Sequence, residues 1–350
     1  MRRIAALVLL LVFALPITAH AQAIQPQASP SQAGGGRTSW RDHLWHFEDM
    51  LYFEPLRADP RAAKMQLIVP AWSKAFPHSL EPGTRFVWQI TLGRELPLVG
   101  WRTDTTGQRV DRGEFGVGLW APVSFHMIED HKDESAPIVD TDYRFGFMTK
   151  AQYGLGSDMW LGVRYTPWAH ESTHLGDEYT VFASQGPEFE RINVSFEYQE
   201  YGVSLEKAFG DSSMITLRHG GIALHGTDGY YSDHLLGDPT PSLSVSEKNF
   251  EPSLGFELRG WERSGRVMFV SVDTRHKLAY QFHRNPGQAE TKHWSTSIAV
   301  GRSVVEGAGA RRSVLLRDYF FHYYRGVNPY GQLRSQSDFW SVGVGWIFGI

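Results

Sequence analysis

The densest group of side chains able to do chemistry lies in one ten-residue segment of the chain. Its polar members are His170, Ser172, His174, Asp177 and Glu178. An imidazole beside a hydroxyl is the pair that activates a serine nucleophile, and carboxylates are ligands for hard cations such as Ca²⁺. The segment therefore predicts a polar site, for which four uses are open: a structural network, ester hydrolysis, zinc binding or the lining of a solute pore.

In the structural interpretation, Asp177 and Glu178 accept hydrogen bonds from loop backbone and pair with arginines, while His170 and His174 bridge them. The candidate partners on neighbouring segments are Asp142, Arg144, Arg164, Arg191, Asn193 and Glu197. Such networks need no chemistry, so a non-enzymatic role is favoured.

The ester-hydrolase interpretation depends on the spacing of His170 and Ser172. Residues two apart on a strand share a face. This H-x-S spacing is similar to that of outer-membrane phospholipase and of lipid A deacylase, and by that resemblance Ser172 would attack an ester and His170 would take its proton. Glu197 or Asn193 would orient the imidazole, and Asp177 with Glu178 would hold Ca²⁺. A lipid acyl hydrolase is therefore the alternative function.

Residues 170–174 also match the zinc motif H-E-x-x-H. That motif works on a helix, where the two histidines share a face. Thr166-Pro167 is a sequence that can start a helix, but Ser172, Thr173 and Gly176 are poor helix formers. Zinc peptidase activity is a minor alternative, and no metal site is predicted beyond the candidate Ca²⁺.

The segments that must position these residues alternate with a period of two from residue 64 onward. In the last segment, Trp340 to Ile350, apolar even positions alternate with mostly small odd positions. Such alternation predicts strands with one apolar face and one polar or small face. Twelve strands are predicted at 64–71, 85–94, 113–127, 141–152, 158–169, 189–207, 213–225, 249–261, 265–279, 292–303, 311–324 and 338–350. A change of parity predicts a bulge at Gln199-Glu200.

Short and long connections alternate between these strands, apart from a long segment at 95–112. Outer-membrane barrels have short periplasmic turns and longer external loops. The sequence therefore predicts an all-β fold, a transmembrane antiparallel β-barrel of about 12 strands over residues 64–350. A soluble β-sandwich has the same periodicity, but the loop alternation and the aromatic last strand favour the barrel.

The predicted parity bears on the functional interpretations. If Leu161, Val163 and Tyr165 face lipid, then His170 and Ser172 face inward. The two lipid hydrolases act from the lipid-facing side, so parity argues against hydrolysis unless a bulge at Pro167 reverses it. Inward charges of both signs favour the fourth use, a narrow pore for polar solutes.

The N-terminal residues resemble a secretory signal. Arg2 and Arg3 precede an apolar stretch, and cleavage is predicted near Ala21 or Ala23 within a signal of residues 1–23. A membrane anchor is the alternative, but the stretch is short for a span. Residues 24–63 are predicted to be a linker with a short amphipathic helix at 40–51, which lies on the membrane surface or packs against the barrel.

Composition narrows the partners. Aromatic residues are 13% of the chain, the formal net charge is −4, and cysteine is absent. A near-neutral charge does not predict a nucleic-acid partner, and the lack of cysteine excludes disulfides, thiolate metal sites and a lipidated cysteine anchor. The expected location is the outer membrane, and the expected partners are its lipids and the barrel insertion machinery.

Several motifs resemble an uncharacterised family of bacterial outer-membrane barrels, domain of unknown function 1207. Residues 170–179 resemble its signature H-x-S-[ST]-H-L-G-D-E-aromatic, and 140–146 resemble its T-D-Y-R-x-G strand. Residues 191–197 resemble its R-I-N-x-S-x-E strand, residues 328–332 resemble its P-Y-G-Q turn, and residues 54–60 resemble its first barrel segment. The resemblance covers about residues 50–350 and implies an outer-membrane barrel without an established activity.

Overall fold

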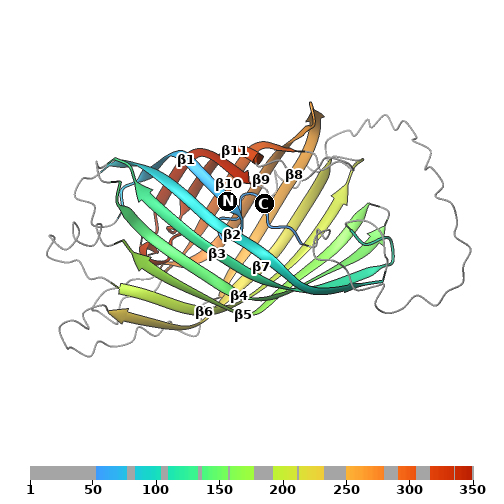
Figure 1. Ribbon diagram of the computed structural model, residues 1–350, viewed down its shortest axis with the longest axis horizontal. Coiled ribbons are helices and arrows are strands. Elements are labelled where there is room, and N and C mark those ends of the chain that lie inside the picture. Colours follow the sequence, from blue (N-terminus) through green and yellow to red (C-terminus); the bar gives the residue numbers. More distant parts are fainter. Residues whose placement is uncertain are drawn as a thin grey trace, which may run out of the picture. The chain divides into compact units, whose positions relative to one another are not determined.

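A computed structural model shows a barrel of antiparallel strands (Figure 1). It describes residues 53–76, 83–103, 109–132, 136–156, 158–176, 192–210, 213–231, 250–279, 291–304, 316–334 and 336–348. Within these ranges the elements are β1 (Met65–Lys74), β2 (Thr84–Arg102), β3 (Phe115–Asp130), β4 (Ile138–Gly156), β5 (Met159–Leu175), β6 (Ile192–Ala208), β7 (Met214–Tyr231), β8 (Phe250–Arg263), β9 (Arg266–Ala279), β10 (Thr291–Val304), β11 (Leu316–Gly326), the 3₁₀ turn η3 (Gly331–Leu333) and β12 (Phe339–Phe348). Each strand pairs with its neighbours in the chain, and β1 pairs with β12 to close the barrel. The prediction of a twelve-stranded barrel is confirmed.

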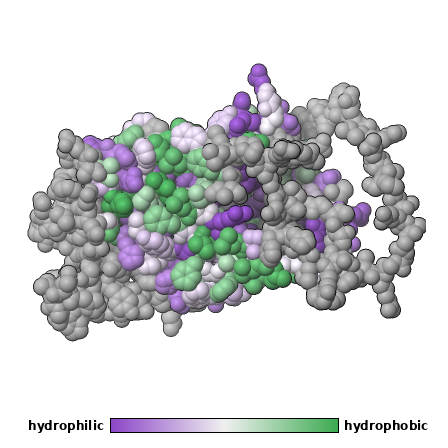
Figure 2. Space-filling model, viewed as in Figure 1, coloured by the Kyte–Doolittle hydropathy of each residue, from purple (hydrophilic) through white to green (hydrophobic). Residues whose placement is uncertain are grey.

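The side chains of the barrel are arranged with apolar groups outside and charges inside. Leu254 of β8 and Phe147 of β4 are 58% and 51% exposed on the outer face, whereas Lys150, Glu257 and Arg275 are buried in the lumen. Apolar patches lie on the wall of the barrel in the view of Figure 2. This inside-out pattern is typical of barrels that cross a membrane and is the reverse of a soluble sandwich. No helix among the described residues is long and apolar enough to cross a membrane.

The connections differ between the two ends of the barrel. At one end the turns are short, such as Ser264-Gly265 between β8 and β9, and we call this the short-connection end. The connection that did not fit the predicted alternation is an extended hairpin, because β2 runs to Arg102 instead of residue 94. In the described part of the connection from β2 to β3, the Val110 carbonyl accepts a hydrogen bond from Trp160 Nε1 at 2.8 Å.

Residues 53–64, which precede β1, lie inside the lumen. Phe53 and Leu56 are 0% and 2% exposed. Glycines on the inner wall make room for them: a Cβ added at Gly202 would lie 2.6 Å from the Phe53 ring, and one at Gly255 would collide with Leu56. We call residues 53–64 the lumen segment. Most of this segment was expected to belong to the linker of residues 24–63, and the predicted helix at 40–51 lies outside the described residues.

The bulge predicted in β6 at Gln199-Glu200 is wrong. Phe196 and Tyr198 are 1% and 2% exposed and face inward with Glu200, so inward residues alternate through this point without a change of parity. The aromatic pair was mistaken for lipid-facing residues because an apolar ring fits either face of the wall. Inside, Tyr198 packs against the lumen segment, with the Arg61 guanidinium 5.0 Å from the centre of its ring.

Candidate functional site

The candidate site depends on a bulge in β5. Thr166 pairs with Glu200 of β6 and Ala169 pairs with Tyr198, so β5 carries one more residue than β6 across this interval. Pro167 lies within it and has no N–H to donate to the ladder, which suits a bulge. The bulge packs tightly on β4, because a Cβ at Gly146 would lie 2.7 Å from the Trp168 carbonyl oxygen. An extra residue exchanges the two faces of the strand beyond it.

Beyond the bulge, odd-numbered residues of β5 face the lumen and even-numbered residues face outward, which is the reverse of the prediction. Glu171 and Thr173 are buried in the lumen, at 5% and 0% exposure. His170, Ser172 and His174 are partly exposed on the outer face. The expectation that His170 and Ser172 face inward is therefore wrong, because it carried the parity of residues 161–165 across the bulge. We call His170, Ser172 and His174 the outward row.

The outward row contains a hydrogen-bonded serine and histidine. Ser172 Oγ lies 3.1 Å from Nε2 of His174. His170 was the expected partner of Ser172 from the H-x-S spacing, and the partner in the structure is His174 instead. The Tyr143 ring of β4 and the His174 imidazole form a T-shaped contact, with 5.9 Å between ring centres. This arrangement gives the hydroxyl a nitrogen base at hydrogen-bond distance on the outer surface.

His170 stands beside this pair and is positioned by two strands. Its ring lies 5.3 Å from that of Phe145 on β4, and its β6 partner in the register is Glu197. Glu197 is exposed on the outer face. The outward row therefore has a carboxylate directly across from His170, at the position where the sequence analysis expected an orienting acid.

The inward residues of the same motif contact other segments inside the barrel. Glu171 forms an ion pair with Arg61 of the lumen segment. Asp142 of β4 accepts a hydrogen bond from the backbone N–H of Gly331, with 3.1 Å and 3.2 Å to its two oxygens. Thr173 packs against Gly331, where an added Cβ would collide with its methyl group. The motif segments around 142, 171 and 331 thus meet inside the barrel.

The other predicted site residues fall into two groups. Arg164 pairs with Glu200 on β6 instead of with the outward row. Arg144 is buried and faces the lumen. The structure does not describe Asp177, Glu178, Arg191 or the side chain of Asn193. The roles predicted for these residues stay predictions.

Sequence reasoning missed the role of Arg61. Its signal was the charge alternation of residues 57–61, Arg-Ala-Asp-Pro-Arg, which has too many charges for a flexible connection. Arg57 pairs with Glu257 of β8 at 2.6 Å and with Asp318 of β11 at 3.0 Å, and Asp59 pairs with Arg275 of β9 at 2.8 Å. These ion pairs join the lumen segment to several strands.

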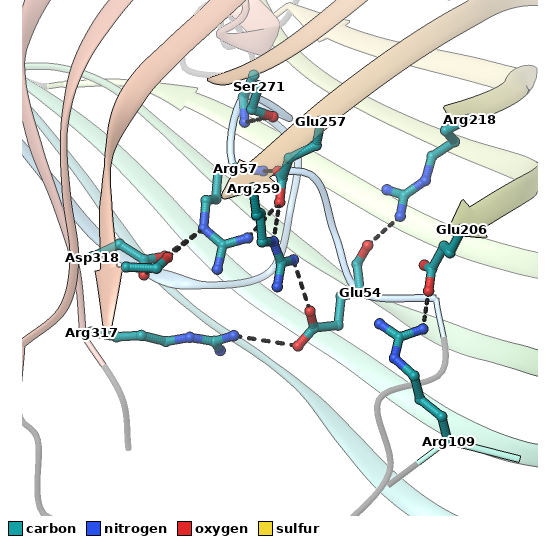
Figure 3. Close-up of polar contacts among 12 residues, drawn as sticks. Glu54, Arg57, Arg109, Glu206, Arg218, Glu257, Arg259, Ser271, Arg317 and Asp318 are labelled. Carbon is teal, nitrogen blue, oxygen red and sulfur yellow. Dashed lines mark hydrogen bonds and ion pairs between the residues drawn. The ribbon is translucent and has the colours of Figure 1, made fainter. Parts of the chain in front are cut away.

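Figure 3 shows the same pattern at the short-connection end of the lumen. The Glu54 carboxylate contacts Arg259 at 3.0 Å and Arg317 at 3.3 Å. Burial acts to raise the pKa of Glu54, but these two guanidinium groups outweigh burial and hold the pKa well below its ordinary value. The Arg218 guanidinium donates to the Glu54 backbone carbonyl. The lumen segment is therefore held by charge-assisted contacts along its length.

The geometry contradicts the zinc interpretation of residues 170–174. They lie on a strand, so His170 and His174 face outward while Glu171 points into the lumen and pairs with Arg61. The helix on which H-E-x-x-H depends is not formed. Among the residues that the structure describes, no group of three or more His, Cys, Asp or Glu could hold a metal ion. The carboxylates expected to hold Ca²⁺, Asp177 and Glu178, lie outside this part of the chain.

Three solved structures of bacterial barrels resemble this fold. The translocator domain of the autotransporter NalP from Neisseria meningitidis is 12% identical, with a TM-score of 0.38 over 84% of this chain and 91% of that one. The transport unit of AIDA-I from Escherichia coli is 12% identical, with a TM-score of 0.36 over 85% and 94%. The β domain of BrkA from Bordetella is 11% identical, with a TM-score of 0.36 over 83% and 100%.

Sequence comparison identifies the family of the chain. No curated protein matches it by sequence. The family described as "Protein of unknown function (DUF1207)" matches residues 20–223, which is more than half of the chain and includes β1 to β6 with the outward row. The resemblance noted from the motifs is confirmed, and the chain belongs to the DUF1207 family of proteins of unknown function.

Proposed function

We propose that this protein is an outer-membrane lipid acyl hydrolase that acts through Ser172 on the lipid-facing surface of the barrel. The observation that carries the proposal is the 3.1 Å hydrogen bond between Ser172 Oγ and His174 Nε2 on the outward row. In the reaction, His174 takes the proton of Ser172 as the hydroxyl attacks an ester carbonyl, and then returns it to the leaving alcohol. Water hydrolyses the acyl-serine in a second step.

The depth of Ser172 supports a lipid ester as the substrate. Ser172 is thirteen residues further along β5 than Met159, which lies at the short-connection end. At about 3.3 Å per residue and a strand tilt of about 40°, Ser172 lies about 33 Å farther along the membrane normal. The hydrocarbon core is about 25–30 Å thick, so Ser172 lies near the opposite interface. We place the short-connection end in the periplasm, which puts the outward row at the outer leaflet.

The surroundings of the outward row support the same assignment. Tyr143 and Phe145 are each 47% exposed beside it, and aromatic side chains are enriched where a barrel crosses a membrane interface. A substrate acyl chain can lie along this apolar surface while its ester reaches Ser172. Export through the signal peptide and assembly by the barrel insertion machinery are parts of this proposal.

A second candidate is a non-enzymatic barrel, with a structural role or a narrow pore. The ion pairs between the lumen segment and the strands favour the closed, structural form. A cavity of about 50 Å³ remains near Arg61, Glu171 and Asp142, enough for a few waters. A pore through this region would require the lumen segment to move aside.

The test is ester cleavage by the purified barrel in detergent, with phospholipid or lipopolysaccharide as substrate, in Ca²⁺ and in chelator. Ser172→Ala should lower the rate at least about 10³-fold. Separate His174→Ala and His170→Ala variants identify the base, and the larger loss is expected for His174. A fluorophosphonate probe should label the parent and not Ser172→Ala.

The matched control is Thr296→Ala, which removes a partly exposed hydroxyl from distant β10. It should retain full activity. Cleavage that persists in Ser172→Ala would overturn the proposal. A complete lack of cleavage and labelling in the parent would also reject it, and bilayer conductance would then separate a pore from a structural barrel.

A further inference from the structure

The barrel wall has a gap beside the start of β1. Residue Thr91 of β2 pairs with Gln66 of β1, but residues 92–102 of β2 pair only with β3. On the other side of the gap, β12 ends at Phe348, which pairs with Met65. Figure 1 shows β2 running on beyond β1, with strands of the far wall visible above it. Among the described residues, nothing continues the sheet along this edge of β2.

A cavity of about 610 Å³ occupies the gap. Its lining includes the buried Lys150 and Trp120 and also Leu92, Leu96 and Val123, which are 42–47% exposed on the outer face. The cavity therefore reaches from the lumen to the lipid-facing surface. Figure 2 shows hydrophilic residues in a hollow beside apolar patches in this view. The volume lies within the usual range of sites for small organic ligands.

The lining of the cavity carries more positive than negative charge. Its cations are Arg57, Lys64, Arg94, Lys150 and Arg317, and its carboxylates are Glu54, Glu95 and Asp318. Each carboxylate is already paired with a lining cation: Glu95 with Lys150, Glu54 with Arg317, and Asp318 with Arg57. Lys64 and Arg94 are the two lining cations that form no ion pair with a lining carboxylate.

Lys64 is arranged to receive an anion. Its ammonium donates to the backbone carbonyls of Arg57 at 2.8 Å and Asp59 at 3.0 Å. An ammonium has three N–H donors, so one donor remains beyond these two. Arg94 contacts no carboxylate within the described ranges. A gap in the wall also leaves backbone groups of β2 in need of polar partners, which hydrocarbon cannot supply.

We propose that this cavity binds a single-chain amphiphile with an anionic head group. The carboxylate or phosphate contacts Lys64 and Arg94, and the acyl chain lies along Leu92, Leu96 and Val123 on the outer face of the wall. A fatty acid and a lysophospholipid both present this chemistry. The site lies near the short-connection end, away from Ser172, and it does not depend on the hydrolase activity.

The experiment measures binding to the full-length Ser172→Ala protein in uncharged detergent, so that hydrolysis cannot alter the probe. The probes are palmitate, a lysophospholipid with an anionic phosphate head group, and monopalmitoylglycerol as the uncharged amphiphile of equal chain length. Palmitate or the lysophospholipid should bind at least about ten-fold more tightly than monopalmitoylglycerol, because charge-assisted hydrogen bonds are stronger than neutral ones. The tighter of the two identifies the head group.

Two variants and one control locate the binding. Lys64→Met and Arg94→Gln should each weaken the anionic probe about ten-fold and leave monopalmitoylglycerol unchanged. Lys207→Met, at a half-exposed lysine of β6 outside the cavity lining, should change neither. Folded gel mobility confirms that each variant forms a barrel. Equal affinity for charged and uncharged probes, unchanged binding in both variants, or no binding of any probe would overturn the proposal.

Discussion

The two faces of β5 beyond its bulge have opposite surroundings although their residues alternate along one segment. Glu171 and Thr173 face the lumen, where they contact Arg61 and Gly331. Ser172 and His174 face outward and contact each other. Residues 170–175 therefore belong to two interleaved groups, one that contacts the lumen segment and one that places a serine beside a histidine on the outer face. The extra residue at the bulge determines which residue belongs to which site.

Deletion of Pro167 should abolish the difference between the two faces and should cause the largest loss of stability. Removing the extra residue shifts the register by one and moves Glu171 to the lipid face. Arg61 would lose its carboxylate at a cost of about 3–5 kcal/mol, and a charged residue facing lipid adds to that. We expect a total loss above about 5 kcal/mol, enough to prevent a stable barrel. The measurement is the fraction that migrates as a folded barrel on an unheated gel.

The control for this deletion is Pro167→Ala, which keeps the residue count. It should fold like the parent, with a cost below about 1 kcal/mol, because the bulge and both faces are retained. If the deletion folded as well as Pro167→Ala, the bulge would not determine the two faces.

Breaking the Arg61–Glu171 pair should have the next largest effect. Glu171→Ala leaves a buried guanidinium without its partner and should lower the free energy of unfolding by about 3–5 kcal/mol. The double variant Arg61→Met, Glu171→Leu removes both charges and should recover most of that loss. Urea unfolding in lipid vesicles measures both values. A double variant no more stable than Glu171→Ala would show that packing, and not the unpaired charge, causes the loss.

Much of the fold was predictable because the period of two is a strong signal over twelve strands. All twelve predicted strands overlap observed ones, and the outward positions of β12 are the predicted even residues. The end of β5 was predicted at residue 169 and lies at Leu175, because polar residues such as His170 and Ser172 on an outer face do not continue the apolar alternation.

The site was predictable in its residues and not in its orientation. The sequence identified Ser172, His170 and His174, and it identified Pro167 as the place where a bulge would reverse them. It did not determine whether the bulge forms, because that depends on the pairing of β5 with both neighbouring strands. The lumen segment was missed for a similar reason: its charges are paired by residues about 100 to 260 positions away, such as Glu171, Glu257 and Asp318.

We expect the stability of the barrel to change with pH through Lys64, the last residue of the lumen segment. Burial and the nearby Arg57 lower its pKa from 10.5 to about 8, against the opposing effects of Asp59, Glu257 and Asp318. Between these values the unfolded chain binds a proton that the folded chain does not. The Lys64 contribution to the free energy of unfolding therefore rises with pH, by at most about 1.4 kcal/mol per unit between about pH 8 and 10.5.

Lys64→Met should remove that rise. The measurement is urea unfolding of parent and variant at several pH values from about 7 to 11, compared as the difference between them. Lys207→Met is the control, because a half-exposed lysine of β6 should leave the slope of the parent intact. A slope in Lys64→Met equal to that of the parent would contradict the assignment.

The smallest change in stability is expected for single replacements on the two faces. Ser172→Ala and Thr173→Ala each remove a hydroxyl from adjacent residues of β5. Thr173 is fully buried against Gly331 and also loses a packed methyl, so its replacement should cost about 1–2 kcal/mol. Ser172 is partly exposed on the outer face, so its replacement should change the free energy of unfolding by less than about 0.5 kcal/mol.

Activity and stability should then separate in opposite directions for these neighbours. Ser172→Ala should abolish ester cleavage in a barrel as stable as the parent, and Thr173→Ala should retain cleavage in a less stable barrel. Urea unfolding and ester release on the same preparations measure both quantities. If both variants lost stability and activity together, Ser172 would serve the packing of the wall, and the outward row would have no chemistry distinct from the lumen face.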